Sequence, residues 1–326
     1  MCHIIKQQIL NWVDFIKYFK FKKKKILLSL SVLLVILAGS LYSEGTDFIR
    51  KRDVIILFEN SLESAAKEAA DIYPGVKEEL EKTFNRQLNL KPTIFLIKNG
   101  EKFKRIVGSD LIVAIAVPER NQIIIDYSKL NKFPFKLRTT LKHELCHLML
   151  HRRIKKGNLP KWLDEGIAQW ISGGLGEIIM GNRRPVLSKA IPSGIYINLR
   201  DLTKRFPEDE KHLLLAYEES RSLVEYINRE FGRKGILNIL HYMEKGDSVD
   251  EAILKSLSIS FEKLEERWHN NLKKEFTWFT YLGNHLYEAL FFLGAVLTVC
   301  AFIKYLIKKR AYRDDKETTL QNYGEF

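Results

Sequence analysis

The sequence predicts an α+β domain, in which a small sheet is followed by a helical subdomain, held between two transmembrane helices. Three observations support this prediction. Short apolar runs rich in β-branched residues occupy residues 93–126, helical apolar spacing dominates from residue 137 onward, and an uncharged run lies near each end. With 46% apolar residues, the 326-residue chain can bury one large core or two small ones.

The first half of the chain predicts a helix and then three strands. Residues 59–86 combine high charge with helical apolar spacing. Thr93–Ile97 and Gln122–Asp126 are short apolar strands, and Leu111–Val117 is a third that stops before Pro118. A helix, strands and a further helix in this order describe a small α+β unit.

The second half predicts helices separated by clear breaks. One helix begins near Pro160, a residue suited to a first helical position, and stops at Ser172-Gly173-Gly174. A longer helix over Glu210–Phe231 ends at Gly232. The other expected elements are a short helix at 236–245, a helix opened by the capping box Ser248–Glu251, a last amphipathic helix from Phe261, and a loop or hairpin within 175–205.

Two uncharged runs are candidate membrane spans. Ile26–Tyr42 holds 17 residues without charge directly after four lysines, which is just enough to cross a bilayer. A cleaved signal peptide is the alternative, but its basic region would be unusually long and no A-x-A site follows. The second candidate is Tyr281–Ile307, which contains 15 consecutive uncharged residues and has a cluster of Lys and Arg after it.

The basic flanks orient both spans. Lysines precede the first span and a Lys/Arg cluster follows the second, so the positive-inside rule places both termini in the cytoplasm. We therefore expect a two-pass protein of the cell membrane whose folded domain is extracytoplasmic. The expected order is a basic N-terminal segment at 1–25, an anchor at 26–42, the domain at 43–280, a transmembrane helix at 281–307 and a tail at 308–326.

The net charge of +13 does not indicate a nucleic-acid partner. Residues 1–25 carry +6 and residues 304–326 carry +2, so only +5 remains for the body between them. No nucleic-acid-binding motif occurs, and basic termini suit a lipid bilayer better. The three cysteines, Cys2, Cys146 and Cys300, form no disulfide pattern, and we expect Cys146 to be a small buried residue.

A candidate metal site lies in the stretch Leu137–His151. Its segment His143-Glu-Leu-Cys-His147 fits the pattern H-E-x-x-H. On a helix the two histidines lie about 40° apart, so both can bind one metal ion. Glu144 beside them can reach a metal-bound water. Leucines at 141, 145 and 148 form an apolar stripe on the other side of the helix.

A catalytic zinc needs a third protein ligand and an open position for water. The metzincin pattern requires Gly at 150 and His at 153, where this chain has Leu150 and Arg153. His151 lies one turn further along the helix, and we expect it to be a polar surface residue. A Glu from a following helix is the other known solution, and Glu165 stands 17 residues beyond His147 in Trp162-Leu-Asp-Glu-Gly166.

The paired motifs His143-Glu-Leu-Cys-His147 and Trp162-Leu-Asp-Glu-Gly166 resemble those of gluzincin metallopeptidases, in particular the peptidase MA-like domain. The resemblance covers about residues 90–275. It implies a zincin-like fold, Zn2+ bound by His143, His147 and Glu165, and Glu144 as general base in the hydrolysis of a peptide or protein substrate. It also points to Tyr217 as the oxyanion donor, with a core tyrosine as the alternative.

The chain departs from the relatives in two places. It lacks the G-x-M-E-N motif that holds a substrate's amino group in relatives of aminopeptidase N, so we expect an endopeptidase rather than an aminopeptidase. Gln169 stands where thermolysin has an Asp that orients a zinc histidine, so the groups around the ligands must differ.

Two further expectations concern the substrate and the activity. Ile123–Ile125 is our candidate strand for pairing with an extended substrate, and an ordinary buried strand is the alternative. The alternative function is a membrane-anchored binding or scaffold protein that keeps the zincin fold without useful turnover. The intact Glu144 speaks against it. The sequence does not specify the oligomeric state.

Overall fold

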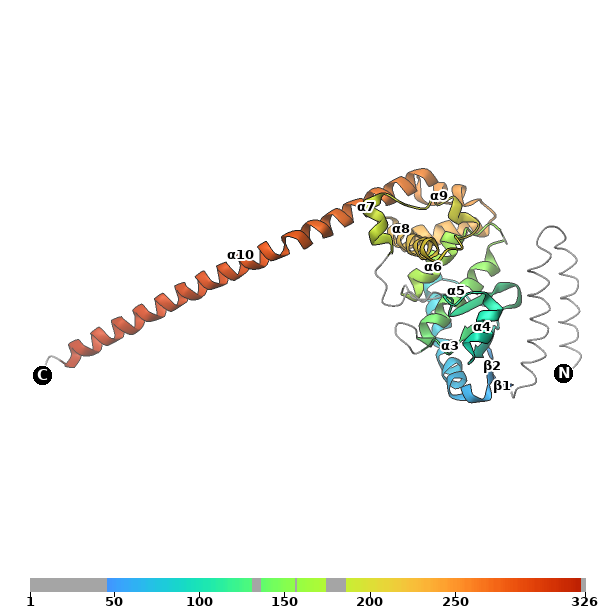
Figure 1. Ribbon diagram of the computed structural model, residues 1–326, viewed down its shortest axis with the longest axis horizontal. Coiled ribbons are helices and arrows are strands. Elements are labelled where there is room, and N and C mark those ends of the chain that lie inside the picture. Colours follow the sequence, from blue (N-terminus) through green and yellow to red (C-terminus); the bar gives the residue numbers. More distant parts are fainter. Residues whose placement is uncertain (1–45, 131–135, 156, 174–185, 324–326) are drawn as a thin grey trace, which may run out of the picture. The chain divides into compact units, whose positions relative to one another are not determined.

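The computed structural model describes residues 46–130, 136–155, 157–173 and 186–323 (Figure 1). Its contacts divide the chain into two units, one of residues up to Leu187 with Tyr196–Glu265 and one of Ser188–Ile195 with the chain from Glu266 onward. The expected basic segment at 1–25 and the expected anchor at 26–42 lie outside the described residues.

A five-stranded sheet forms the N-terminal part of the first unit. The strands lie in the order β1-β2-β3-β5-β4, with β2, β3 and β5 parallel and each outer strand antiparallel to its neighbour. Strands β3 and β5 have the predicted bounds, and β4 begins three residues later than predicted. Strands β1 and β2 have no counterpart in the prediction; β1 contains no buried residue and so shows no apolar alternation. The bounds are β1 Thr46–Arg50, β2 Ile55–Glu59, β3 Thr93–Ile97, β4 Ala114–Val117 and β5 Gln122–Asp126.

Strand β5 is an interior strand, so the expectation that Ile123–Ile125 pairs with a substrate is wrong. Ile124 is paired with Phe95 of β3 on one side and with Ile115 of β4 on the other. Both edges of β5 are therefore occupied by ladder hydrogen bonds. The three consecutive isoleucines are all buried, as expected for a strand covered on both faces. Strand β4 takes the edge of the sheet instead.

Most helices follow the predicted breaks, but α4 has no counterpart in the prediction and α7 lies within the expected loop or hairpin at 175–205. Helix α8 bends at Gly232, whose φ of 68° and ψ of 172° interrupt the helix where the sequence predicts its end. Helix α9 opens with the predicted capping box between Ser248 and Glu251. The bounds are α3 Glu63–Phe84, α4 Gly100–Val107, α5 Leu137–Arg153, α6 Lys161–Ser172, α7 Val186–Ser193, α8 Glu210–Glu244, α9 Val249–Leu257 and α10 Phe261–Tyr323. The described chain is thus a small sheet with a mostly helical remainder.

Helix α5 lies at the centre of the first unit, in contact with α3, β4 and α6 (Figure 1). Helix α6 in turn packs against α8 at very short range, and Gly166 is the contact point. A Cβ atom at Gly166 would lie 2.4 Å from the backbone oxygen of Ser220 and 2.6 Å from a methyl group of Val224. Only glycine allows the two helix backbones to approach this closely.

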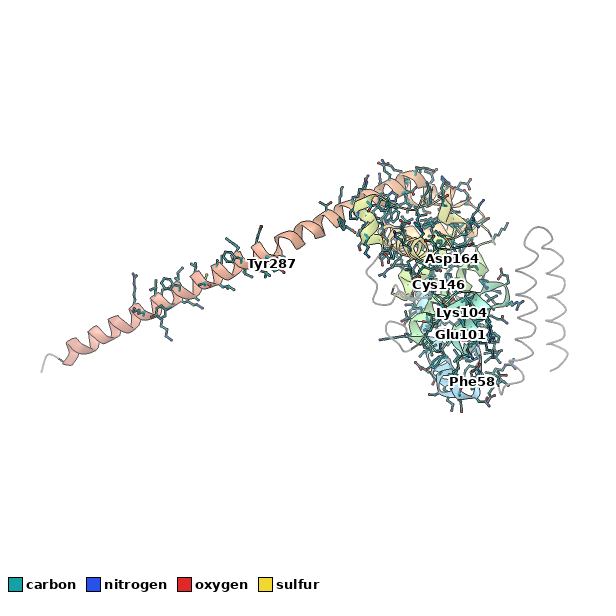
Figure 2. The ribbon with its side chains drawn as sticks, viewed as in Figure 1. Phe58, Glu101, Lys104, Cys146, Asp164 and Tyr287 are labelled. Atoms are coloured by element: carbon teal, nitrogen blue, oxygen red, sulfur yellow. The ribbon has the colours of Figure 1, made fainter. Side chains whose placement is uncertain are left out.

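Helix α10 contains a segment long and apolar enough to cross a membrane. Leu286–Arg310 spans 25 residues, and its most apolar stretch has a mean hydropathy of 2.3 with no residue buried against the rest of the protein. Tyr287, labelled in Figure 2, is 82% exposed. The segment overlaps the predicted transmembrane helix at 281–307. It is the single such helix within the described ranges, and the assignment rests on length and composition.

Replacing Gly166 with Ala should destabilise the protein, because the new methyl group meets the backbone of Ser220, which cannot move aside as a side chain can. Overpacking of this kind costs about 1–3 kcal/mol. The expected result is a lower melting temperature for the detergent-solubilised full chain. Gly75→Ala is the matched control, since its Cβ would make only ordinary contacts, at 3.6 Å, with Arg138. Because Ala has a higher helix propensity than Gly, Gly75→Ala should leave the stability of the protein unchanged or raise it by up to about 1 kcal/mol. Equal melting temperatures for the two variants would contradict the close contact.

Candidate metal centre

Helix α5 brings three polar side chains into the interior of the first unit. His143 and Glu144 are fully buried and His147 is 4% exposed. They are buried because the polar face of α5 is covered by α6, which packs along it. The apolar face, with the buried Leu141 and Leu145, lies in the core as the sequence predicts.

The two histidines meet Glu165 of α6 at one point. The Nε2 atoms of His143 and His147 are 3.1 Å apart, and Oε2 of Glu165 lies 3.6 Å from the first and 3.7 Å from the second. Around a tetrahedral metal with bonds of about 2.0–2.1 Å, neighbouring ligand atoms are separated by roughly 3.3 Å. The three atoms therefore have the spacing of ligands that share one metal ion.

The carboxylate of Glu165 provides a separate test of this fit. Its Oε1 atom accepts a hydrogen bond from Lys161, whereas the buried Oε2 atom has no hydrogen-bond partner among the described residues. A buried carboxylate oxygen without a donor is costly unless a cation satisfies it. Burial raises the pKa of Glu165, but the charges of Lys161 and His147 outweigh this effect and lower the pKa. The residues present thus fit a metal ion bound at Oε2.

Asp164, which sequence reasoning missed, holds His147 in place. Its Oδ1 atom lies 2.7 Å from Nδ1 of His147, and its Oδ2 atom lies 2.7 Å from Nε2 of His151. With Nδ1 directed at a carboxylate, His147 keeps Nε2 for a metal. Burial raises the pKa of Asp164, but the charge of His147 and hydrogen bonds from both histidines hold it well below its usual range. Asp164, a residue of α6, is labelled in Figure 2.

His151 is not simply a polar surface residue. Its side chain is 32% exposed and pairs with Asp164, so it belongs to the network around the histidine helix. One signal in the sequence points to this pairing. His147 and His151 lie four residues apart and therefore on one face of the helix, and an acidic residue directly precedes Glu165. The partner across two helices becomes evident only when α5 and α6 are packed together.

The side chains that support the histidines differ from the thermolysin arrangement, in which an Asp stands at the position of Gln169. The sequence predicts this difference. Gln169 donates a hydrogen bond through Nε2 to the backbone oxygen of Tyr217, at 3.0 Å, and so joins α6 to α8. Ser172 instead faces the first histidine, with Oγ 3.4 Å from Nδ1 of His143. Cys146, labelled in Figure 2, is fully buried as predicted, and burial raises the pKa of its thiol.

Tyr217 lies in a small apolar cluster on α8. It is 6% exposed, shares the cluster with Leu214, and packs edge-on against Phe206 with ring centroids 4.9 Å apart. The ammonium of Lys161 lies 6.0 Å from the centroid of the same Phe206 ring. Phe206 is therefore a shared neighbour of Tyr217 and of Lys161, the residue that contacts Glu165. Its packing agrees with a core tyrosine, and its role as oxyanion donor stays a prediction.

The region that holds these residues matches a known family. A profile of the Peptidase MA superfamily matches residues 95–274, which is more than half of the chain. The chain belongs to the Peptidase MA superfamily. The match runs from β3 into α10 and includes His143, Glu144, His147, Glu165 and Tyr217. Membership supports a metallopeptidase-type function.

Solved structures that match this chain include two larger proteins. Legionella pneumophila aminopeptidase A, in complex with aspartic acid, aligns with a TM-score of 0.42 and 12% identity over 69% of this chain and 27% of its own. Yeast LTA4 hydrolase, in complex with bestatin, aligns with a TM-score of 0.41 and 14% identity over 71% of this chain and 37% of its own. The chain thus spans less than two fifths of either protein. A search of curated proteins finds no match.

Changing Asp164 to Asn should weaken metal binding without removing any of the three converging atoms. The neutral amide keeps the size of the side chain but loses the charge-assisted bond that holds His147. Loss of such a supporting group lowers metal affinity by about 10- to 100-fold. Competition with a chromophoric chelator measures the affinity for zinc. The control is Asp53→Asn, which removes another ion-paired carboxylate, bonded to Lys77 at 2.8 Å and 44% exposed. Unchanged affinity in Asp164→Asn would show that Asp164 does not support His147.

Proposed function

We propose that the protein is a zinc-dependent metallopeptidase, with His143, His147 and Glu165 as metal ligands. The observation that carries this proposal is the convergence of two imidazole nitrogens and one carboxylate oxygen within 3.1–3.7 Å of one another. Two His and one Glu are a ligand set of catalytic zinc sites, which leave the fourth position open. A structural zinc site would have four protein ligands and would favour Cys.

Glu144 is the general base of the proposed reaction. When bound, zinc supplies a water molecule of lowered pKa and polarises the scissile carbonyl. Glu144 follows His143 directly on α5 and is fully buried, which supports a place for its carboxylate near the ligands in a region of low dielectric. It takes a proton from the water and later delivers it to the leaving amine. Asp164 and His151 keep His147 oriented during this cycle.

The substrate of this proposal is a peptide or protein, cleaved at an internal bond. The chain lacks the G-x-M-E-N motif that would hold a free amino terminus, which supports endopeptidase over aminopeptidase activity. Strand β4 lies at the edge of the sheet and contacts α5, so an extended substrate that pairs there would run beside the histidine helix.

The proposed enzyme is anchored in the cell membrane by two helices, with its domain outside and both termini in the cytoplasm. The apolar segment Leu286–Arg310 supports the second anchor, and the uncharged run at 26–42 in the sequence supports the first. The basic residues before the first run and after the second support the orientation. Partners on this view are the lipid bilayer and a peptide or protein substrate, with no nucleic acid.

Changing Glu144 to Gln should abolish hydrolysis while leaving zinc bound, since Glu144 is no ligand in this proposal. The expected loss in turnover is about 10²- to 10⁴-fold, because an amide cannot accept the proton. Digestion of a peptide library by the detergent-solubilised full chain measures activity, and metal analysis measures zinc. His147→Ala and Glu165→Ala should lose zinc and activity together.

Three outcomes would contradict these assignments. Zinc content equal to wild type in His147→Ala and Glu165→Ala would remove the ligand set. An unchanged rate in Glu144→Gln would remove the general base. A wild-type protein that binds zinc yet cleaves no member of the library would favour the inactive scaffold.

Tyr217 is the proposed oxyanion donor, so Tyr217→Phe should lower turnover by about 10²-fold or more with unchanged zinc content. Tyr226→Phe is the matched control, since Tyr226 lies on the same helix and is likewise 6% exposed. It should keep full activity. If Tyr217→Phe instead lowers the melting temperature and leaves turnover intact, the core alternative is correct.

A further inference from the structure

Lys161 is a partly exposed residue that contacts the buried carboxylate of Glu165. The two residues lie one turn apart on α6, and the Lys161 ammonium donates a hydrogen bond to Oε1 of Glu165. The Glu165 side chain is fully buried, while that of Lys161 is 37% exposed. One oxygen of the carboxylate is therefore held by a lysine, and the other faces the two histidines.

We propose that Lys161 is a positioning residue that restricts Glu165 to one metal-binding oxygen. This inference rests on the proposed function. A carboxylate can bind a metal through one oxygen or through both. If both oxygens of Glu165 bound zinc, the site would have four protein donor atoms, and water or substrate would have to enter as a fifth ligand. By occupying Oε1, Lys161 keeps the fourth position open for water or substrate.

The geometry supports binding through Oε2 alone. This atom is nearly equidistant from the two Nε2 atoms, at 3.6 and 3.7 Å, and has no hydrogen-bond donor among the described residues. The ammonium of Lys161 also lies 6.0 Å from the centroid of the Phe206 ring, which adds a second favourable contact at this position. Both contacts favour the lysine at Oε1.

The pair differs from an ordinary surface ion pair. Lys67–Glu63 and Lys82–Glu78 have the same four-residue spacing, but all four side chains are more than 60% exposed. Such pairs contribute about 0.3–0.5 kcal/mol, and water replaces the lysine when it is lost. At Glu165 the carboxylate is buried, so loss of Lys161 leaves Oε1 without its donor and with the metal as the nearest cation.

The position of Lys161 in its helix also calls for a specific reason. It is the first residue of α6, directly after Pro160. The partial positive charge of a helix N-terminus favours acidic residues and disfavours a lysine there. The bond to Glu165 offsets this unfavourable placement, which points to a role at the metal centre rather than in helix stability.

The experiment compares Lys161→Met with Lys161→Arg in the full chain, loaded with cobalt(II) in place of zinc. Met keeps the length of the side chain but donates no hydrogen bond, whereas Arg keeps a charged donor. Cobalt(II) absorption in the visible range weakens and shifts as the coordination number rises. Lys161→Met should bind one cobalt with a spectrum of higher coordination number, and Lys161→Arg should keep the wild-type spectrum. Turnover of the zinc form should fall about 10-fold or more in Lys161→Met with little change in KM.

Lys82→Met is the control, because it removes a lysine with the same spacing on the exposed surface of α3. A wild-type spectrum in Lys161→Met, or an equal change in Lys161→Arg or Lys82→Met, would overturn the proposal. If Lys161→Met does not fold, Lys161→Ala takes its place and the same spectra decide. A wild-type chain that takes up no cobalt or zinc would instead refute the proposed function itself, and with it this inference.

Discussion

The contact between α6 and α8 at Gly166 determines where the metal centre can form. The two helix backbones meet there without an intervening side chain, so the distance between them is fixed by atoms that cannot change rotamer. Glu165 is the neighbouring residue and points the other way, towards α5. The position of the third candidate ligand relative to the two histidines is thus set by helix packing on the opposite side of α6. Gln169 adds a hydrogen bond to α8 along the same interface.

Helix α6 contributes two buried carboxylates to the site, and each would be costly to bury without a partner of opposite charge. Asp164 and Glu165 are adjacent carboxylates in a fully buried part of the chain, and the pKa of each is lowered. They remain ionised because each has its own set of partners. Asp164 lies between two histidines, and Glu165 lies between Lys161 and the pair of Nε2 atoms. A buried charge is tolerated when it is paired on both sides, and every member of this group has a defined partner or a place for a cation.

The sequence predicts the local features of the fold well, because they depend on neighbours along the chain. The helical spacing of His143 and His147, the capping box at Ser248 and the break at Gly232 each follow from a few residues. The bounds of β3 and β5 follow from apolar runs between turn residues. Features that depend on topology are harder to predict. The sequence of a single strand does not specify which strands lie beside it, so the interior position of β5 could not be predicted.

The candidate metal centre likewise has features that local sequence predicts and features that depend on how the helices pack. The first two candidate ligands follow from helix periodicity, whereas Glu165 follows from the resemblance of two motifs. Asp164 and His151 come together across α5 and α6, 13 residues apart in the chain, and the spacing of the histidines alone does not specify that contact. The presence of Gln169 in place of an acidic residue predicts that other side chains support the histidines. It does not indicate that Asp164 contacts His147 and that Ser172 faces His143.

The burial of the three ligand atoms has a kinetic consequence. His143 and Glu165 have no exposed surface and His147 has 4%, so no ligand can swing into solvent while the surrounding helices stay packed. Release of an ion by all three side chains would require a local opening of α5 from α6, which would slow its exchange. The metal that is present when the chain folds would then remain for much of the lifetime of the molecule. Which metal fills the candidate centre would then be decided by the ions present during folding rather than by those that the folded protein meets later.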